Sequence, residues 1–590
     1  MSFECGDLGL AQTASACYTR KKGGKHMAKF AELWTEAGKN LTGIPWDVYP
    51  RPSLRRDSFY NLNGSWALAV GEKGTFDREI RVPFPPESLL SGVHQVFPDG
   101  TVLRYRRRFS LPESFRTGRV LLHFGAVDQK ARVYLNDTLL GTHTGGYEGF
   151  SFDITARLRE ENTLLVETTD SLKDKSLPYG KQRRDRGGMW YTPVSGIWQT
   201  VWLERVPEDY IREVRFSTEN QRVTLELIGP PGGTLRVKTP EGALLAEIRD
   251  SRAVLDVPAP RHWSPEDPYL YEAEITAGED KVGSYFAFRT LETKVIGGIP
   301  RLCLNGKPYF FHGVLDQGYW SDGLFTPAEP ACFDRDILAM KELGFNMLRK
   351  HIKVEPELFY YACDRLGMVV FQDMVNNGAY HFLRDTALPT LGIGKHRSDR
   401  HLHRDPETRR RFREGMESTV LALEKHPSVC YWTIFNEGWG QFDSRNRYEE
   451  LKELDRSRFV DTASGWFSCG DSDVESLHVY FRPVRLPGSE KPLVLSEFGG
   501  YSWKIQGHAF NLEKTYGYRY FEDGASFMDA LETLYRTEII PAKDRGLCAA
   551  VYTQLSDVED ETNGLVSYDR AVCKADKTRM RAIGQELTHF

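Results

Sequence analysis

Two glutamates stand sixty residues apart, each at the end of an apolar run. Glu437 ends Tyr431-Trp-Thr-Ile-Phe-Asn-Glu437, and Glu497 ends Pro492-Leu-Val-Leu-Ser-Glu497. Because a carboxylate is costly to desolvate and adds nothing to an apolar core, this position indicates chemistry. Either segment alone could be a plain strand end. Two carboxylates that converge on one pocket are the minimum set for cleaving a glycosidic bond, so together they predict a glycosidase.

The two runs are apolar on both faces, as the buried parallel strands of a barrel are. From about residue 294 onward, strands and helices alternate, which predicts a (β/α)8 TIM barrel over 294–590 with its chemistry at the carboxyl ends of the strands. A doubly wound open sheet is the alternative, but no Gly-rich phosphate loop follows the first strand. The predicted strands are 309–314, 346–351, 369–374, 429–437, 459–464, 478–480, 493–497 and 547–555, and the predicted helices are 333–343, 355–366, 407–425, 443–457 and 525–537.

The sequence before the barrel has a different pattern. Short alternating strands with turns between them predict a β jelly-roll sandwich over 45–206. A smaller set of strands, with Pro-Pro-Gly-Gly at 230–233, predicts an immunoglobulin-like β-sandwich over 207–293. Residues 1–44 are predicted to be an N-terminal extension, in which Tyr18–His26 is basic and Gly-rich, and Met27 is either the natural start or a junction.

Composition excludes several classes of protein. The 590 residues are 40% hydrophobic and carry a formal net charge of only −5, so we expect no nucleic-acid partner and no membrane partner. The first residues do not have the pattern of a secretory signal. Nine cysteines are scattered along the chain, several inside apolar runs, which is typical of reduced thiols in a cytoplasmic protein. We recognise no ligand cluster for a metal and expect no cofactor.

Beyond the two glutamate segments, five further motifs occur in a fixed order. With them, the chain resembles glycoside hydrolase family 2, which includes the β-galactosidases and β-glucuronidases. The resemblance spans about residues 45 to 575 and keeps the domain order of that family. The motifs are Ser195-Gly-Ile-Trp-Gln199, Pro258–Tyr271, Asn305-Gly-Lys-Pro308, Gly344–His351 and His426–Val429.

The resemblance implies a retaining hydrolase with Glu437 as general acid/base and Glu497 as nucleophile. The two carboxyl groups should then lie about 5 Å apart, and an ionised Glu497 would keep Glu437 protonated. In the family pattern, Asn436 would bind the sugar 2-hydroxyl, Arg349 would keep the nucleophile ionised and Tyr480 would hydrogen-bond it. Candidates for contacts with sugar hydroxyls are His351, Asp316 and Asp373, and candidates for stacking on a sugar face are Trp439 and Trp503. The alternatives are a strand-end cap for Asn436, an outer salt bridge for Arg349, a structural role for His351 and core packing for the two tryptophans.

The sequence indicates the identity of the sugar less clearly than it indicates the type of reaction. Family β-glucuronidases carry an Asn-x-Lys pair after the nucleophile, whereas the comparable triplet here, Asn305-Gly-Lys307, lies at the barrel entry. Another cation, Lys504 or Arg519, could serve in its place. We therefore expect an exo-acting β-galactosidase-type enzyme that acts on a glycoside or oligosaccharide. A β-glucuronidase or β-galacturonidase is the alternative within the family, and a non-catalytic carbohydrate-binding protein is the alternative outside it. The sequence leaves the exact sugar, and assembly into a homo-oligomer, open.

Overall fold

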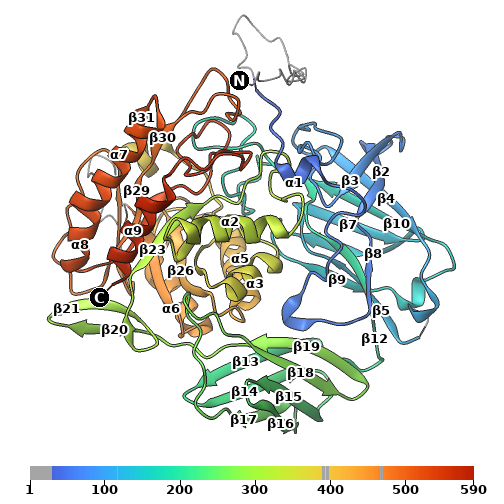
Figure 1. Cartoon of the computed structure of the whole chain (residues 1–590). Helices are drawn as coiled ribbons and strands as arrows, with labels where there is room; N and C mark the ends of the chain where they lie inside the picture. The colour runs from blue at the N-terminus through green and yellow to red at the C-terminus, as the bar shows by residue number, and fades with distance from the viewer. Residues whose placement is uncertain are drawn as a thin grey trace, which may run out of the picture.

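The computed structural model describes residues 30–589 except 116, 389–392, 394–397, 466, 468 and 469. Figure 1 shows two β domains beside a larger domain of strands and helices. Most of the expected N-terminal extension, including Met27, lies outside the described residues. Its last part packs on the barrel: it forms helix α1 (Glu36–Lys39), and Thr35 binds Asp322 through its backbone N–H and its hydroxyl.

The first β domain is a jelly-roll sandwich of two antiparallel sheets, as predicted. One sheet has the strand order β3-β2-β4-β10-β7-β8 and the other β1-β12-β5-β9. Side chains of β10 alternate between buried and half-buried, which is the period of two that a sandwich requires. The strands are β1 (Phe59–Asn61), β2 (Gly64–Val70), β3 (Arg78–Val82), β4 (Val102–Phe109), β5 (Arg119–Phe124), β7 (Lys130–Leu135), β8 (Thr138–Thr144), β9 (Phe150–Asp153), β10 (Asn162–Thr169) and β12 (Val201–Val206), with β6 (Val127–Asp128) paired to β11 (Gly196–Ile197).

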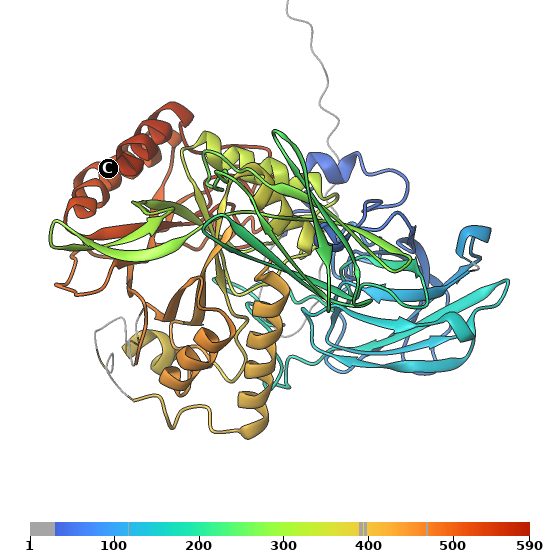
Figure 2. The same ribbon diagram turned by 90° about the horizontal axis from the view of Figure 1, so that it is seen from below.

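The second β domain is the smaller sandwich, with sheets β13-β14-β17 and β16-β15-β18-β19. Figure 2 shows it in green, in front of the junction between the jelly roll and the barrel. It is tied to the barrel by the indole of Trp263, which donates a hydrogen bond to the carbonyl of Asp364. Its strands are β13 (Glu213–Glu219), β14 (Arg222–Ile228), β15 (Gly233–Thr239), β16 (Gly242–Ile248), β17 (Arg252–Asp256), β18 (Tyr271–Ala277) and β19 (Asp280–Phe286).

The third domain is built around an eight-stranded sheet, and all the ladders of this sheet are parallel. The strand order, β27-β26-β25-β24-β23-β32-β29-β28, follows the chain around a ring, and β27 and β28 lie next to each other where it closes. This is the predicted TIM barrel. The strands are β23 (Phe311–Asp316), β24 (Met347–Lys350), β25 (Val369–Asp373), β26 (Val429–Asn436), β27 (Phe459–Ser464), β28 (Glu475–Val479), β29 (Leu493–Gly499) and β32 (Leu547–Thr553).

Helices surround these strands, as Figure 1 shows. A three-stranded sheet of β20 (Leu291–Ile296), β21 (Ile299–Leu304) and β22 (Lys307–Pro308) precedes the first barrel strand. The last helix, α9, which packs against β23, was not predicted from the sequence. The main helices are α2 (Ala331–Glu342), α3 (Glu357–Leu366), α5 (Pro406–Leu423), α6 (Ser444–Leu454), α7 (Gly524–Leu534), α8 (Ile540–Asp544) and α9 (Lys577–Thr588).

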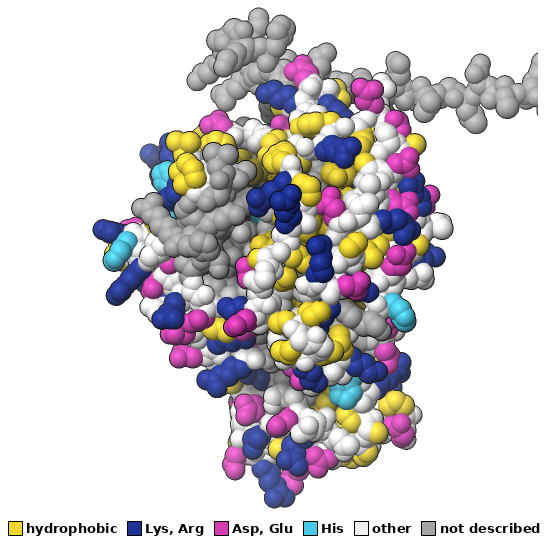
Figure 3. All heavy atoms as spheres, turned by 90° about the vertical axis from the view of Figure 1, so that its left-hand side faces the viewer, with side chains coloured by type: hydrophobic (Ala, Val, Ile, Leu, Met, Phe, Trp, Pro, Cys, Tyr) yellow, Lys and Arg dark blue, Asp and Glu magenta, His cyan; other side chains and the backbone are white. Residues whose placement is uncertain are grey.

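The surface agrees with the modest net charge. On the described part of the face in Figure 3, basic and acidic side chains lie among one another and among hydrophobic ones. None of the helices in the described part of the chain combines the length and the apolar character that crossing a membrane requires.

Candidate active site

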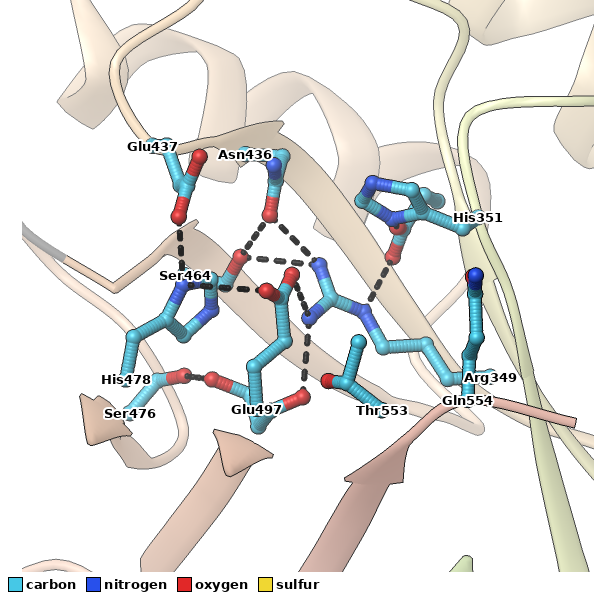
Figure 4. Close-up of polar contacts among 12 residues, drawn as sticks. Arg349, His351, Asn436, Glu437, Ser464, Ser476, His478, Glu497, Thr553 and Gln554 are labelled. Atoms are coloured by element: carbon cyan, nitrogen blue, oxygen red, sulfur yellow. Dashed lines mark hydrogen bonds and ion pairs between the residues drawn. The ribbon is translucent and has the colours of Figure 1, made fainter. Parts of the chain in front are cut away.

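The two glutamates meet at the carboxyl end of the barrel. Glu437 directly follows β26, and Glu497 lies within β29. A carboxylate oxygen of each and a ring nitrogen of His478 lie within 4.8 Å of one another. Glu437 has a φ of +50°, a conformation that is uncommon for a residue with a side chain and is concentrated at functional sites. The barrel thus brings both carboxylates into one small volume (Figure 4).

Glu497 is held by three neighbours. Arg349 donates from Nη1 to Oε1 at 3.1 Å, the Tyr480 hydroxyl donates to Oε2, and Nδ1 of His478 lies 3.6 Å from Oε2. Burial alone would raise the pKa of Glu497, but the electrostatic effects of His478, Arg349 and His351, with the hydrogen bond from Tyr480, outweigh it and lower this pKa to about 2. Glu497 is therefore an ionised carboxylate across the ordinary pH range.

Arg349 organises the centre of the site. Its guanidinium donates to Asp373 at 3.0 Å, to the Ser496 carbonyl at 3.0 Å and to Asn436 at 2.8 Å, besides Glu497. Arg349 is 1% exposed, and although burial opposes its charge, the carboxylates of Asp373 and Glu497 raise its pKa. A planar fork of five donors matches this arrangement as no other side chain does.

Asn436 faces the space between the glutamates with one end of its amide already occupied. Its Oδ1 accepts from Arg349 and, at 2.8 Å, from the Ser464 hydroxyl. This fixes the amide so that Nδ2 remains to donate to a ligand. Ser464, at the end of β27, was not singled out from the sequence.

Asp373 and His351 form a second pair. Nδ1 of His351 lies 2.7 Å from Oδ2 of Asp373, whose other oxygen accepts from Arg349. Both side chains are at least 97% buried. Burial, followed by the charge of Lys181, lowers the pKa of His351. Asp373 therefore positions its neighbours rather than facing the pocket.

His478 is the most direct omission of the sequence analysis. Its Nδ1 lies 3.0 Å from Oε1 of Glu437 and bridges toward Glu497, as Figure 4 shows. His478 lies two residues before Tyr480, and in an extended strand such residues share a face. Because Tyr480 is expected to contact Glu497, the same strand pattern also predicts that His478 faces the site.

Two expected residues lie elsewhere. Asp316 is paired in register with Lys350, and its carboxylate lies 2.6 Å from the Lys350 ammonium in a cluster with Glu355, outside the barrel interior. Arg349, one residue earlier on β24, faces inward, so alternation turns Lys350 and its partner toward the helices. Trp503, on β30 (Tyr501–Trp503), packs against Phe527 of α7. No described contact joins either side chain to Glu437 or Glu497, and the ion pair of Asp316 contradicts the expected contact with sugar hydroxyls.

Trp439 lies in the site but is not open. It is 1% exposed, because Trp190 stacks on it with ring centroids 5.1 Å apart and Tyr380 contacts its ring edge. Trp190 belongs to the jelly-roll domain, so a segment far away in sequence covers this side of the barrel mouth. We therefore interpret Trp439 as a packing residue and not as an exposed ring on which a sugar stacks.

The described contacts of the cations considered for a uronic acid do not include Glu437 or Glu497. Asn305 and Lys307 flank the turn between β21 and β22, before the first barrel strand and thus at the opposite end of the barrel. The Lys504 ammonium donates to the Lys514 carbonyl, and Arg519 lies over the rings of Tyr501 and Phe521. None of these contacts includes a group of the site.

The spacing of Glu437, His478 and Glu497 would also suit a metal ion. However, the Arg349 guanidinium already supplies a positive charge 3.1 Å from Glu497, and a second cation there would be repelled. The arrangement fits acid–base and nucleophilic chemistry on a sugar better than it fits metal binding.

Comparison with known families adds an independent finding. Residues 299–499 match the model for the TIM-barrel domain of glycosyl hydrolases family 2, residues 98–193 match the galactose-binding domain-like model of glycosyl hydrolase 2, and residues 210–289 match a third model, glycosyl hydrolases family 2. The three matches have the order that the sequence motifs indicated.

Individual proteins that carry these domains are also similar to this chain. The chain is 25% identical to a β-galactosidase of Thermoanaerobacter pseudethanolicus over 60% of its own length and 47% of that protein, and 25% identical to a putative β-glucuronidase of Formosa agariphila over 58% and 40%. It therefore spans about half the length of the curated relatives it matches. Among solved structures, a β-glucuronidase from an uncultured Clostridium superposes with a TM-score of 0.70 at 19% identity, covering 92% of this chain and 99% of that one, which shows a shared fold.

Proposed function

The chain belongs to glycoside hydrolase family 2, and from this premise we propose that it is an exo-acting retaining β-glycosidase of the β-galactosidase type. It would hydrolyse terminal β-D-glycosides by double displacement through a covalent glycosyl-enzyme. The observation that carries this proposal is the pair Glu437 and Glu497, with carboxylate oxygens within 4.8 Å at the barrel mouth. Oxygens this close support a retaining enzyme, because the carboxyl groups of an inverting pair leave room for a water molecule and stand about 6.5–9.5 Å apart.

In the first step, Glu497 attacks the anomeric carbon and Glu437 donates a proton to the leaving oxygen. Glu497 suits the first role because it is ionised, buried and oriented by Arg349 and Tyr480. In the second step, Glu437 takes a proton from a water molecule whose oxygen attacks the anomeric carbon, and the bond from that carbon to Glu497 breaks, which releases the sugar and restores the Glu497 carboxylate. His478 contacts Glu437 and is therefore placed to assist the transfer of the proton that Glu437 donates in the first step and takes up in the second.

Asn436 supports the transition state. With Oδ1 engaged by Arg349 and Ser464, its Nδ2 donates to the 2-hydroxyl of the sugar, a contact that strengthens as positive charge develops on the ring. Because both carboxylates and their supports are present, the alternative of a non-catalytic carbohydrate-binding protein has no observation in its favour.

The charges around the glutamates bear on which sugar the site binds. No described contact joins Lys307, Lys504 or Arg519 to Glu437 or Glu497, which supports a neutral sugar such as galactose. A β-glucuronidase or β-galacturonidase is the second candidate, and one observation favours it: the ammonium of Lys181 lies in the site 5.7 Å from the centroid of the Trp439 ring. A carboxylate on the sugar could neutralise that charge.

The stereochemical outcome tests the mechanism. We expect the first-formed sugar to have the same anomeric configuration as the β-glycoside substrate, because two displacements at one carbon restore it. Proton NMR of the product within the first minutes, before mutarotation, measures this directly. A product of inverted configuration would rule out Glu497 as a nucleophile.

Substrate charge separates the two candidates. We expect p-nitrophenyl β-D-galactoside to have a higher kcat/KM than p-nitrophenyl β-D-glucuronide, which shares its leaving group. A preference of about 100-fold for the uronide corresponds to about 2.7 kcal/mol of transition-state binding and would reverse the ranking.

A further inference from the structure

A long segment of the jelly-roll domain lies across the barrel mouth. This bridging loop, residues 170–195, joins β10 to β11 and is drawn in teal in Figure 1. It is fixed at three barrel loops: the Tyr179 hydroxyl donates to the Gly378 carbonyl, Trp190 stacks on Trp439, and Arg186 pairs with Glu559 and Asp560. The loop is therefore part of the wall around the glutamates and not a mobile connection.

Lys181, in the bridging loop, presents a buried charge to the site. The residue is 8% exposed, and its ammonium lies 5.7 Å from the ring centroids of both Tyr191 and Trp439. Among the described residues, the ammonium has no hydrogen-bond acceptor and no carboxylate within ion-pair distance. Two aromatic faces only partly replace the water that such a charge loses on burial. A partner from outside the chain would complete its coordination.

Glu561 lies nearby, on the loop after β32. Its Oε2 accepts from the Tyr191 hydroxyl and from Nε2 of Gln554, both at 2.7 Å, while Oε1 accepts no hydrogen bond from the described residues. Burial raises the pKa of Glu561, and the charge of Lys181 is the largest effect that opposes this rise. The two groups are thus close enough to interact but form no ion pair with each other.

We propose that Lys181 and Glu561 together hold adjacent hydroxyl groups of the sugar, which makes them the determinants of a neutral glycone. An ammonium donates only and a carboxylate accepts only, whereas a hydroxyl does both, so a diol satisfies both groups. The 2-hydroxyl is assigned to Asn436, so the pair would hold hydroxyls farther from the scissile bond. A uronate would meet the Lys181 charge but would also face the carboxylates of Glu561 and Glu497.

This inference rests on the proposed function and names the sugar class for the same site. Its test uses the purified full-length enzyme with p-nitrophenyl β-D-galactoside and the 3-deoxy, 4-deoxy and 6-deoxy analogues. We expect Lys181→Met and Glu561→Gln each to lower kcat/KM on the parent galactoside by about 10- to 100-fold, the range for a hydrogen bond to a charged group. On the deoxy sugar that lacks the hydroxyl concerned, each variant should match the wild type within about threefold.

The controls make the outcome specific. Lys173→Met removes an exposed lysine from the same loop and should leave every rate unchanged. An equal loss for Lys181→Met on all three deoxy sugars would show that Lys181 only supports the loop, and would overturn the inference. A wild-type preference for p-nitrophenyl β-D-glucuronide that Lys181→Met abolishes would overturn it in favour of a carboxylate partner. A wild-type enzyme inactive on every glycoside contradicts the proposed function itself, and this inference with it.

Discussion

Glu437→Ala is expected to accumulate a glycosyl-enzyme on a dinitrophenyl β-glycoside, whereas Glu497→Ala should form none. Dinitrophenolate leaves with little protonation, so the first displacement survives the loss of the acid. The second displacement then lacks its base and should slow by about 10²–10⁴-fold. Removing the nucleophile instead should lower turnover of every aglycone by at least about 10⁴-fold.

Azide distinguishes the two variants by product. In Glu437→Ala, azide needs no base and attacks the glycosyl-enzyme, which should restore turnover and yield the β-glycosyl azide. In Glu497→Ala, azide can attack only the substrate, and the product should be the α-azide. Mass spectrometry of the trapped enzyme and NMR of the azides measure both outcomes, with the exposed Glu449→Ala as the control for loss of a carboxylate. Swapped azides, or equal leaving-group dependence in both variants, would contradict the assignment.

Arg349→Met is expected to impair both stability and activity. It leaves Glu497 and Asp373 buried without their shared cation, and breaking a buried ion pair costs about 3–5 kcal/mol of unfolding free energy. We expect kcat/KM to fall by about 10³-fold or more, because the nucleophile and Asn436 both lose their orienting contact. Urea unfolding and steady-state kinetics measure the two effects separately.

The pH profile identifies how Arg349 acts. Glu497 reacts as the carboxylate, and its pKa of about 2 keeps it ionised at any higher pH, so it should add no acid limb to kcat/KM between pH 4 and 7 in the wild type. Without Arg349 this pKa rises, and activity should be lost at a higher pH than before. Arg349→Lys keeps the positive charge but has one nitrogen in place of three. Its kcat/KM should therefore be lower, while the dependence of kcat/KM on pH at the acid side should remain that of the wild type. An unchanged acid limb in Arg349→Met would mean that Arg349 does not keep the nucleophile ionised.

The sequence was sufficient for the fold and for the centre of the site. Strand periodicity places residues at the carboxyl ends of barrel strands, and Glu437, Glu497, Asn436 and Arg349 all lie where short-range patterns end. Each strand supplies one or two groups to a common ring, so the local pattern is enough to bring them together. The last helix, α9, was missed because a long irregular loop separates it from β32.

The remaining errors come from information that is not local. Asp316 was assigned to the site from its strand end alone, and only its register with Lys350 shows that it faces the helices. Lys181 lies more than two hundred residues before either glutamate, in a domain whose pattern describes a sandwich and not a barrel. Its place at the site depends on how two domains dock, and neither periodicity nor spacing records that arrangement.

The bridging loop limits how the jelly roll and the barrel can be exchanged between proteins. A barrel transferred alone to another scaffold would expose the face of Trp439 that Trp190 covers, and would leave Glu559, Asp560 and Glu561 without Arg186 and the Tyr191 hydroxyl. The jelly roll and the barrel therefore do not behave as interchangeable modules. A recombination event, or an engineer exchanging domains, must move the two together or rebuild the wall of the site.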